Sequence, residues 1–216
     1  MNIWGYVNKY TFDSPENQIK LLLKKVKKLT KRADLRILDA GGGLEDRGKL
    51  LEKLGKRTLF DIKPGDNVNV IGDIHKLPFP SKSFDLITLF MVMEHLYDPL
   101  RAIKECQRVL RKNGILVATT VQYWHTHGHP NDYYRYTKDG LMYVFNNANL
   151  PIKSIWSIGG PFLVIYHAIE LNLPSQARKL FFLSCPIFNY LDKKFFNHQD
   201  KRKNFDSVGW SLLAQK

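Results

Sequence analysis

The sequence has few cysteines and no long uninterrupted hydrophobic run. Its two cysteines, Cys106 and Cys185, lie outside any Cys-x-x-Cys or Cys/His spacing. We therefore expect neither a disulfide framework nor a structural zinc site. The uncharged stretch between Lys153 and Glu170 is 16 residues long, and it contains Gly-Gly-Pro at 159–161. A stretch this short and interrupted is not expected to span a bilayer.

The N-terminus lacks a basic start followed by an apolar stretch, so no secretory signal is visible and we expect a cytoplasmic protein. Of the 216 residues, 44% are hydrophobic and 25% are charged, which is the composition of an ordinary globular protein. This composition excludes a disordered or collagen-like chain. The length predicts a single domain over residues 1–216.

Basic residues outnumber acidic ones by 33 to 20, which gives a net charge of +13. Such an excess favours a nucleic acid or an anionic membrane as partner. Residues 1–34 carry 8 basic and 3 acidic side chains, and residues 160–216 carry 8 and 4. The middle of the chain is nearly balanced, so the excess charge belongs to the two ends.

Region 1–34 is predicted to contain a basic amphipathic helix. Apolar side chains recur there at spacings of three and four residues, between lysines: they are Ile19, Leu22, Leu23, Val26 and Leu29. Two interpretations remain open. The lysines are the solvated face of a helix packed on the core, or they attract phosphate groups.

From Leu35 onward, short apolar runs alternate with helix-length segments, a pattern typical of a doubly wound, mostly parallel α/β sheet. The seven predicted strands are 35–40, 57–62, 68–71, 84–90, 114–121, 152–158 and 207–214. One helix is predicted after Asp98, with Pro99 in its first turn, and another over 137–147. Region 160–206, rich in aromatic residues, is expected to be a helical insertion before the last strand.

The most distinctive motif is Ile-Leu-Asp-Ala-Gly-Gly-Gly at residues 37–43. Glycines at the end of a strand let the backbone approach a ligand closely, and the following helix presents unpaired N–H groups. A dinucleotide fingerprint would need a third glycine at position 46, where Asp46 would repel a pyrophosphate. The motif therefore disfavours a nicotinamide or flavin site, and a tight turn without a ligand remains the alternative.

Two further acids end predicted strands. Asp61 lies twenty residues after Gly41, where an acid can accept hydrogen bonds from both hydroxyls of a ribose. Pairing with Lys63 is the alternative. Asp73 ends the third strand and can accept from an adenine amino group, with Ile74 as an apolar wall. A simple turn is the alternative at Asp73.

Asp39, Asp61 and Asp73 are expected at the carboxyl ends of three adjacent strands, where open α/β sheets bind ligands. Three carboxylates would repel a triphosphate unless metal ions compensated the negative charge. The three acids therefore favour a cationic nucleoside as ligand. S-adenosylmethionine, which carries a sulfonium and an ammonium group, fits that charge.

Between Leu35 and about Leu150 the chain resembles the class I S-adenosylmethionine-dependent methyltransferases. The matching segments are 37–43, Asp61, 72–79, 83–87, 94–96, 98–99 and 108–114. The cofactor-binding residues that the resemblance implies are Asp39, Gly41 and Gly43 for the methionine end, Asp61 and Ile62 for the ribose, Asp73 and Ile74 for the adenine, and Leu89 and Phe90 for the pocket wall.

Residues 127–137, His-Gly-His-Pro-Asn-Asp-Tyr-Tyr-Arg-Tyr-Thr, are similar to a segment after the fifth strand in a subgroup of these enzymes. Many members of that subgroup serve surface-glycan or related small-molecule pathways. This position implies that the segment lies beside the transferred methyl group. We expect His127 to be a general base, Asp132 an orienting or substrate-binding carboxylate, and Arg135 an anion clamp. His95 is a second candidate base.

Other roles remain open for the same residues. Asp132 and Arg135 would pair simply to pin the loop, and His95 would be a packing residue. A metal held by His125, His127, His129 and Asp132 is a further alternative. Histidines at alternate loop positions need not converge, so no metal is expected.

The sequence thus predicts methyl transfer from S-adenosylmethionine to a small-molecule, sugar or lipid-linked acceptor, at oxygen. The alternatives are a noncatalytic binding module and a nucleic-acid methyltransferase, although Phe-Met-Val-Met at 90–93 lacks an Asn/Asp-Pro-Pro-Tyr/Phe signature. The 160–206 insertion is expected to be a lid, a dimer contact, a surface for a lipid-linked acceptor or a core-packed cap. With the basic ends, it favours peripheral membrane contact.

Overall fold

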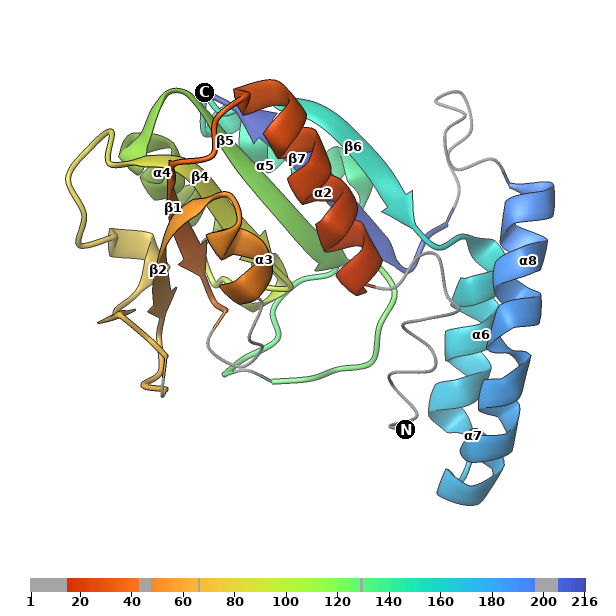
Figure 1. Cartoon of the computed structure of the whole chain (residues 1–216). Coiled ribbons are helices and arrows are strands. Elements are labelled where there is room, and N and C mark those ends of the chain that lie inside the picture. The colour runs from red at the N-terminus through yellow and green to blue at the C-terminus, as the bar shows by residue number, and fades with distance from the viewer. Residues whose placement is uncertain (1–14, 43–47, 66, 129, 197–205) are drawn as a thin grey trace.

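A seven-stranded sheet with helices on both faces forms the centre of the molecule (Figure 1). The structure is a computed structural model that describes residues 15–42, 48–65, 67–128, 130–196 and 206–216. The strands are β1 (Leu35–Ala40), β2 (Gly55–Asp61), β3 (Val70–Ile71), β4 (Phe84–Phe90), β5 (Leu110–Val121), β6 (Ile152–Ile158) and β7 (Gly209–Gln215). Their order in the sheet is β3-β2-β1-β4-β5-β7-β6.

Among the described strands, β7 alone is reversed: it pairs antiparallel with β5 and with β6, and the other pairs are parallel. The predicted fold class is therefore confirmed, and β1, β4 and β6 begin and end where the sequence placed them. Other boundaries differ: β2 starts at Gly55, β3 is reduced to Val70–Ile71, β5 starts at Leu110 rather than at residue 114, and β7 starts at Gly209. These are edge positions of the pattern, where a strand has few apolar residues to mark it.

The helices cover the two faces of the sheet in separate layers (Figure 1). On one face, α2 (Pro15–Thr30) and α3 (Gly48–Glu52) pack on apolar side chains of β1, β4 and β5. On the other face, α4 (Pro99–Val109) and α5 (Lys138–Asn147) enclose the larger core. Among the described helices, none combines the length and the apolar character that a bilayer span needs.

Helix α2 packs its apolar stripe on the sheet, as predicted, except at Leu29, which is 54% exposed. The side-chain oxygen of Gln18 accepts hydrogen bonds from Trp156 Nε1 (2.7 Å) and Ser211 Oγ (3.3 Å). These bonds tie α2 to β6 and β7. The ammonium of Lys25 lies 4.0 Å above the Trp156 ring, which adds a cation–π contact at the same place.

The predicted start of α4 is also confirmed: the Asp98 side chain accepts from Arg101 N (3.0 Å), and Pro99 occupies the first turn. Thr137 caps α5 in the same way, through Gly140 N (3.1 Å). Each cap fixes the residue at which its helix begins.

The insertion before β7 contains α6 (Pro161–Asn172), α7 (Ser175–Phe181), the short 3-10 helix η3 (Phe182–Ser184) and α8 (Cys185–Phe195). These helices stand together beside the sheet (Figure 1). The buried carboxylate of Asp192 in α8 accepts from the backbone N–H groups of Gly160, Phe162 and Leu163 at 2.9–3.1 Å. A carboxylate on the N-terminus of α6 therefore joins α6 to α8.

The turn after β1 requires glycine at position 41. Gly41 has a φ of +78°, and a Cβ there would lie 2.4 Å from Cγ2 of Val92. Its backbone N–H donates to Phe60 O at 2.8 Å. Both the left-handed backbone and the close approach of the segment after β4 exclude a side chain.

We expect Gly41→Ala to lower the free energy of unfolding by about 1–3 kcal/mol, because alanine adds backbone strain as well as a clash. Urea denaturation measures the change. In the double variant Gly41→Ala/Val92→Ala the clash is removed and the backbone strain stays, so part of the loss should return. An unchanged unfolding free energy for Gly41→Ala would contradict the turn described here.

Candidate active site

Asp39 lies near the end of β1, Asp61 ends β2, and Asp73 comes shortly after β3. Their carboxylates are not all accessible to one ligand. The side chain of Asp39 is buried. It accepts from Thr88 Oγ1 (2.6 Å) and Arg57 Nε (2.9 Å), and Arg57 Nη2 forms an ion pair with its Oδ2 at 2.7 Å. Asp39 therefore does not offer its charge to a cationic ligand as expected, because the carboxylate is paired with the Arg57 guanidinium.

Arg57 is a residue that the sequence interpretation missed. It lies in β2 beside Ile37 of β1 and its side chain is only 10% exposed. The sequence did contain a signal for this pair: an arginine inside a partly apolar strand is expected to be buried, and a buried guanidinium needs an anionic partner. The pair packs against the glycine turn: a Cβ on Gly42 would lie 2.6 Å from Asp39 Oδ2.

Asp61 and Ile62 lie at the open end of β2. Oδ1 of Asp61 accepts from the backbone N–H of Lys63 at 3.0 Å. Ile62 is exposed and joins no described core cluster. The position is thus accessible from solvent, as a ribose site would need. Gly43, predicted to touch the methionine end, lies outside the described residues.

Asp73 belongs to a hydrogen-bonded network with His75 and Tyr97. Its Oδ1 accepts from His75 N (2.9 Å) and contacts His75 Nδ1 (2.5 Å), and Tyr97 Oη donates to its Oδ2 (3.2 Å). Burial would raise the pKa of Asp73, but the hydrogen bonds from His75 and Tyr97 outweigh it and hold that pKa below its ordinary value. With 42% of its side chain exposed, Asp73 is an anion that a ligand can reach.

The ring of His75 is buried against Tyr97, with ring centroids 3.8 Å apart. Its Nε2 accepts from Asp98 N at 3.3 Å, so its proton lies on Nδ1, toward Asp73. The sequence motif contained His75, but only the structure shows that it connects Asp73 to the start of α4.

The apolar residues predicted to line the pocket are mostly part of the core. Ile74 is buried in the larger core cluster. Leu89 and Phe90 are successive residues of β4, so their side chains point to opposite faces and join different clusters. They do not face one pocket together, and this part of the prediction is corrected.

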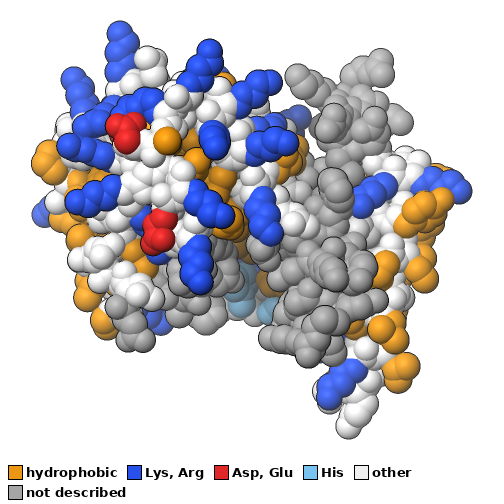
Figure 2. Space-filling view, in the orientation of Figure 1, with side chains coloured by type: hydrophobic (Ala, Val, Ile, Leu, Met, Phe, Trp, Pro, Cys, Tyr) orange, Lys and Arg blue, Asp and Glu red, His pale blue; other side chains and the backbone are white. Residues whose placement is uncertain are grey.

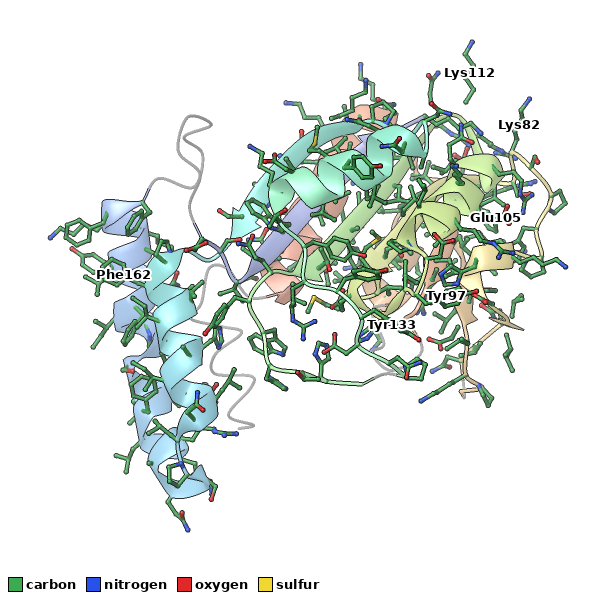
Figure 3. All side chains as sticks on the ribbon, turned by 180° about the vertical axis from the view of Figure 1, so that it is seen from behind. Lys82, Tyr97, Glu105, Lys112, Tyr133 and Phe162 are labelled. Atoms are coloured by element: carbon green, nitrogen blue, oxygen red, sulfur yellow. The ribbon has the colours of Figure 1, made fainter. Side chains whose placement is uncertain are left out.

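The segment after β5 folds back across the carboxyl edge of the sheet, onto the residues that follow β4 (Figure 1). The backbone N–H groups of Tyr133 and Tyr134 donate to Glu94 O at 2.9 and 3.2 Å, and Tyr134 Oη donates to Tyr97 O at 3.3 Å. The side chains of Tyr97 and Tyr133 lie on the same side of the molecule (Figure 3). The segment therefore reaches the network around Asp73.

Arg135 is fully used in holding this segment. It forms a two-pronged ion pair with Asp132, at 2.5 and 2.7 Å. Its remaining N–H groups donate to the backbone oxygens of Trp124, His125 and Tyr134. Because a guanidinium has five N–H donors, none is left for an anion. The anion-clamp prediction is corrected: Arg135 pins the loop.

Asp132 is the centre of that pin, and its pKa lies far below the usual range, chiefly because Arg135 donates to it. Its Oδ2 also accepts from His127 N at 2.9 Å and lies 3.6 Å from His127 Nδ1. Asp132 therefore fixes the place of His127 in the chain, which agrees with the orienting role.

Glu94, His95 and His127 form a cluster where this segment meets the short 3-10 helix η2 (Met93–His95). The rings of His95 and His127 are 5.0 Å apart. Glu94 is fully buried, and Thr120 Oγ1 donates to its Oε2 at 2.8 Å. Burial raises the pKa of Glu94 above its ordinary value. One ligand atom from each of the three residues lies within 4.8 Å of the others, so they could hold a metal ion.

Sequence reasoning named His95 and His127 as candidate bases but did not assign Glu94 a role. The signal was an acid beside His95 just after a buried strand. The four-residue metal set weighed from the sequence is not tested, since His129 lies outside the described residues.

Comparisons with known proteins find methyltransferases. Residues 48–118 match the model of a methyltransferase domain. A demethylmenaquinone methyltransferase of Thermotoga maritima is 40% identical over 75 residues, 35% of this chain and 30% of that protein. A ubiquinone/menaquinone biosynthesis C-methyltransferase of Hahella chejuensis is 30% identical over 106 residues, 40% of this chain and 43% of that protein. The matches thus span less than half the length of either relative.

The fold matches a solved structure over almost its whole length. The 1,6-didemethyltoxoflavin-N1-methyltransferase of Burkholderia thailandensis, solved with bound 1,6-didemethyltoxoflavin and S-adenosylhomocysteine, superimposes with a TM-score of 0.59. The match covers 99% of this chain and 86% of that one at 13% identity, so it shows the fold alone. The resemblance to methyltransferases therefore rests on the domain match and the relatives, to which this structure adds the fold.

Proposed function

We propose that this protein transfers a methyl group from S-adenosylmethionine to a hydroxyl oxygen of a small-molecule, sugar or lipid-linked acceptor. One observation carries the proposal: Tyr97 donates to Asp73, on the donor side, and its backbone oxygen accepts from Tyr134, on the segment that holds His127. The proposed donor site and the proposed proton acceptor therefore share one edge of the sheet, where α/β folds bind ligands.

On the donor side, the glycine turn at Gly41 would receive the methionine end, a role that the resemblance also implies for Gly43. Asp39, held by Arg57, supports that turn rather than binding the ammonium directly. Asp61 would accept from the ribose hydroxyls, next to Ile62.

Asp73 would accept from the adenine amino group, with the neighbouring Ile74 supporting the adenine side. Of the three acids first considered, Asp61 and Asp73 remain accessible, and their charge still suits a cationic donor. Leu89 and Phe90 would affect the donor pocket by shaping the end of β4, and they would not both line the pocket.

On the acceptor side, the reaction is an in-line displacement. The acceptor oxygen attacks the methyl carbon, the carbon–sulfur bond breaks, and its electron pair goes to sulfur to give S-adenosylhomocysteine. The hydroxyl proton would pass to His127, with His95 as second candidate. Alignment supplies about 7–11 kcal/mol in comparable intramolecular reactions, and a base adds roughly 10²–10⁴-fold.

Two other functions use the same fold: a noncatalytic binding module and a nucleic-acid methyltransferase. The Lys and Arg side chains gather on the face that α2 covers (Figure 2), away from the carboxyl edge of the sheet. A shallow depression there is lined by Leu21, Lys24, Lys25, Lys27 and Lys28. The concentration of positive charge over α2 favours a small-molecule acceptor at the proposed site.

The insertion supports a membrane-associated or lipid-linked acceptor. Leu180, Leu183 and Ile187, at the α7–η3–α8 turn, are 73%, 65% and 59% exposed. Basic residues flank them, among them Arg178 and Lys179. Exposed apolar side chains beside basic ones are typical of surfaces that bind anionic lipid.

Calorimetry with S-adenosylmethionine and S-adenosylhomocysteine tests the donor site. We expect both to bind, and Asp61→Ala to weaken binding roughly ten- to a hundredfold, because each hydrogen bond to a charged acceptor contributes about 1.5–3 kcal/mol. Asp34→Ala is the matched control, an exposed acid just before β1, at the opposite end of that strand. No heat for either nucleoside would refute the proposal.

Replacing His127 with Ala should lower methyl transfer roughly 10²–10⁴-fold while leaving S-adenosylmethionine affinity nearly unchanged. Transfer is measured with methyl-tritiated S-adenosylmethionine and the dialysable fraction of a cell extract. His125→Ala is the control, since the His125 side chain is exposed and lies two residues away. Equal losses of donor affinity and turnover would refute the role of His127 as a base.

Vesicle sedimentation tests the membrane contact. The variant Leu180→Asp/Leu183→Asp should reduce binding to anionic vesicles at least about tenfold, because two exposed apolar side chains lose their burial in lipid. Leu29→Asp, on α2, is the control at another exposed leucine. Sedimentation that does not depend on anionic lipid or on Leu180 and Leu183 would count against this surface.

A further inference from the structure

Glu94 presents a buried carboxylate that the proton-transfer role of His127 does not explain. Its side chain is completely buried. Oε2 accepts from Thr120, whereas Oε1 has no hydrogen-bond partner within the part of the chain that the structure describes. An unpartnered carboxylate oxygen in the interior is costly, so its presence points to a group that is meant to bind there.

Two imidazoles stand next to this oxygen. His95 and His127 each offer a ligand atom, and together with a Glu94 oxygen these atoms lie within 4.8 Å of one another. Two histidines and one glutamate form the ligand set of several catalytic zinc sites. Metal–ligand bonds of about 2.0–2.2 Å would draw the three groups together by roughly 1 Å.

The second nitrogen of each imidazole already has the contacts expected of a metal ligand. His95 Nδ1 lies 2.6 Å from Asn131 O, and His127 Nδ1 lies 3.1 Å from His125 O. A carbonyl oxygen can only accept, so the Nδ1 atoms carry the protons and the Nε2 atoms carry the lone pairs. Backbone carbonyls and carboxylates commonly orient metal-binding histidines in this way.

The loop around His127 is held rigidly enough to preserve that orientation. Asp132 Oδ2 lies 3.6 Å from His127 Nδ1, and Arg135 fixes Asp132 with two hydrogen bonds. Metal sites depend on such outer contacts, whose loss typically lowers metal affinity by about 10- to 100-fold.

We propose that Glu94, His95 and His127 bind a divalent transition-metal ion of the zinc type. Three protein ligands leave a four-coordinate ion one position for water or an acceptor oxygen, the arrangement of catalytic rather than structural zinc sites. Placing an acceptor there rests on the proposed function, but the ion site itself does not. An ion on His95 and His127 takes the nitrogen lone pairs that would otherwise accept the hydroxyl proton, so ion binding and the base role exclude each other at any one time.

Metal titration of the full chain, freed of metal with a chelator, tests the site. Zn²⁺ binding is followed by calorimetry, and Co²⁺ binding by the visible absorption of the ion. We expect one ion per chain, and Glu94→Gln and His127→Asn to weaken Zn²⁺ at least about 100-fold, because each removes a direct ligand. His125→Asn should bind Zn²⁺ as the unmodified protein does.

Equal Zn²⁺ affinity in Glu94→Gln, His127→Asn and the unmodified protein would overturn the site, as would an absence of Zn²⁺ and Co²⁺ binding. Thermal unfolding without metal checks each variant, and His127→Asn carries the test if Glu94→Gln does not fold. S-adenosylhomocysteine is titrated into the same samples. Its binding without metal binding would refute the ion site and leave the proposed methyl transfer intact.

Discussion

The return of the segment after β5 onto the backbone of Glu94 is the constraint on which the acceptor side of the site depends. Two backbone N–H groups bind one carbonyl oxygen there, and the Asp132–Arg135 pair closes the loop behind them. Without these bonds, His127 would have no fixed relation to the end of β4. With them, residues far apart in the sequence meet where three parallel strands also end.

The same edge explains why the donor side is built as it is. Gly41 must be small because the segment after β4 passes close to it, and Asp39 is held beneath the turn by Arg57. The burial of that ion pair stiffens the turn and removes one negative charge from the site. The two acids that remain accessible are the ones placed at the ends of β2 and β3.

The sequence was sufficient to predict the strands of the sheet, because the pattern of apolar residues that marks a strand lies within the strand itself. Alternating apolar runs located β1, β4 and β6 to the residue, and the Asp98–Pro99 pair located the start of α4. The site was harder, because partners of a polar side chain are set by long-range contacts. Nothing in the local pattern shows that Arg57 binds Asp39 or that Arg135 spends all its donors on the loop.

Glu94 illustrates the same limit, since the segment that binds its backbone oxygen lies some forty residues later in the chain. The Asp192 cap on α6 is another case, in which an acid of α8 stabilises a helix that begins thirty residues earlier. The direction of side chains within a strand, however, is a local property that the sequence alone predicts. Alternation along β4 already separates Leu89 from Phe90.

A crystal structure of the protein with S-adenosylhomocysteine tests most directly whether donor and acceptor groups share this edge. The account predicts ribose hydroxyls at Asp61, the adenine near Asp73, and the sulfur facing the cluster of Glu94, His95 and His127. A nucleoside bound elsewhere, or one whose sulfur points away from that cluster, would contradict it.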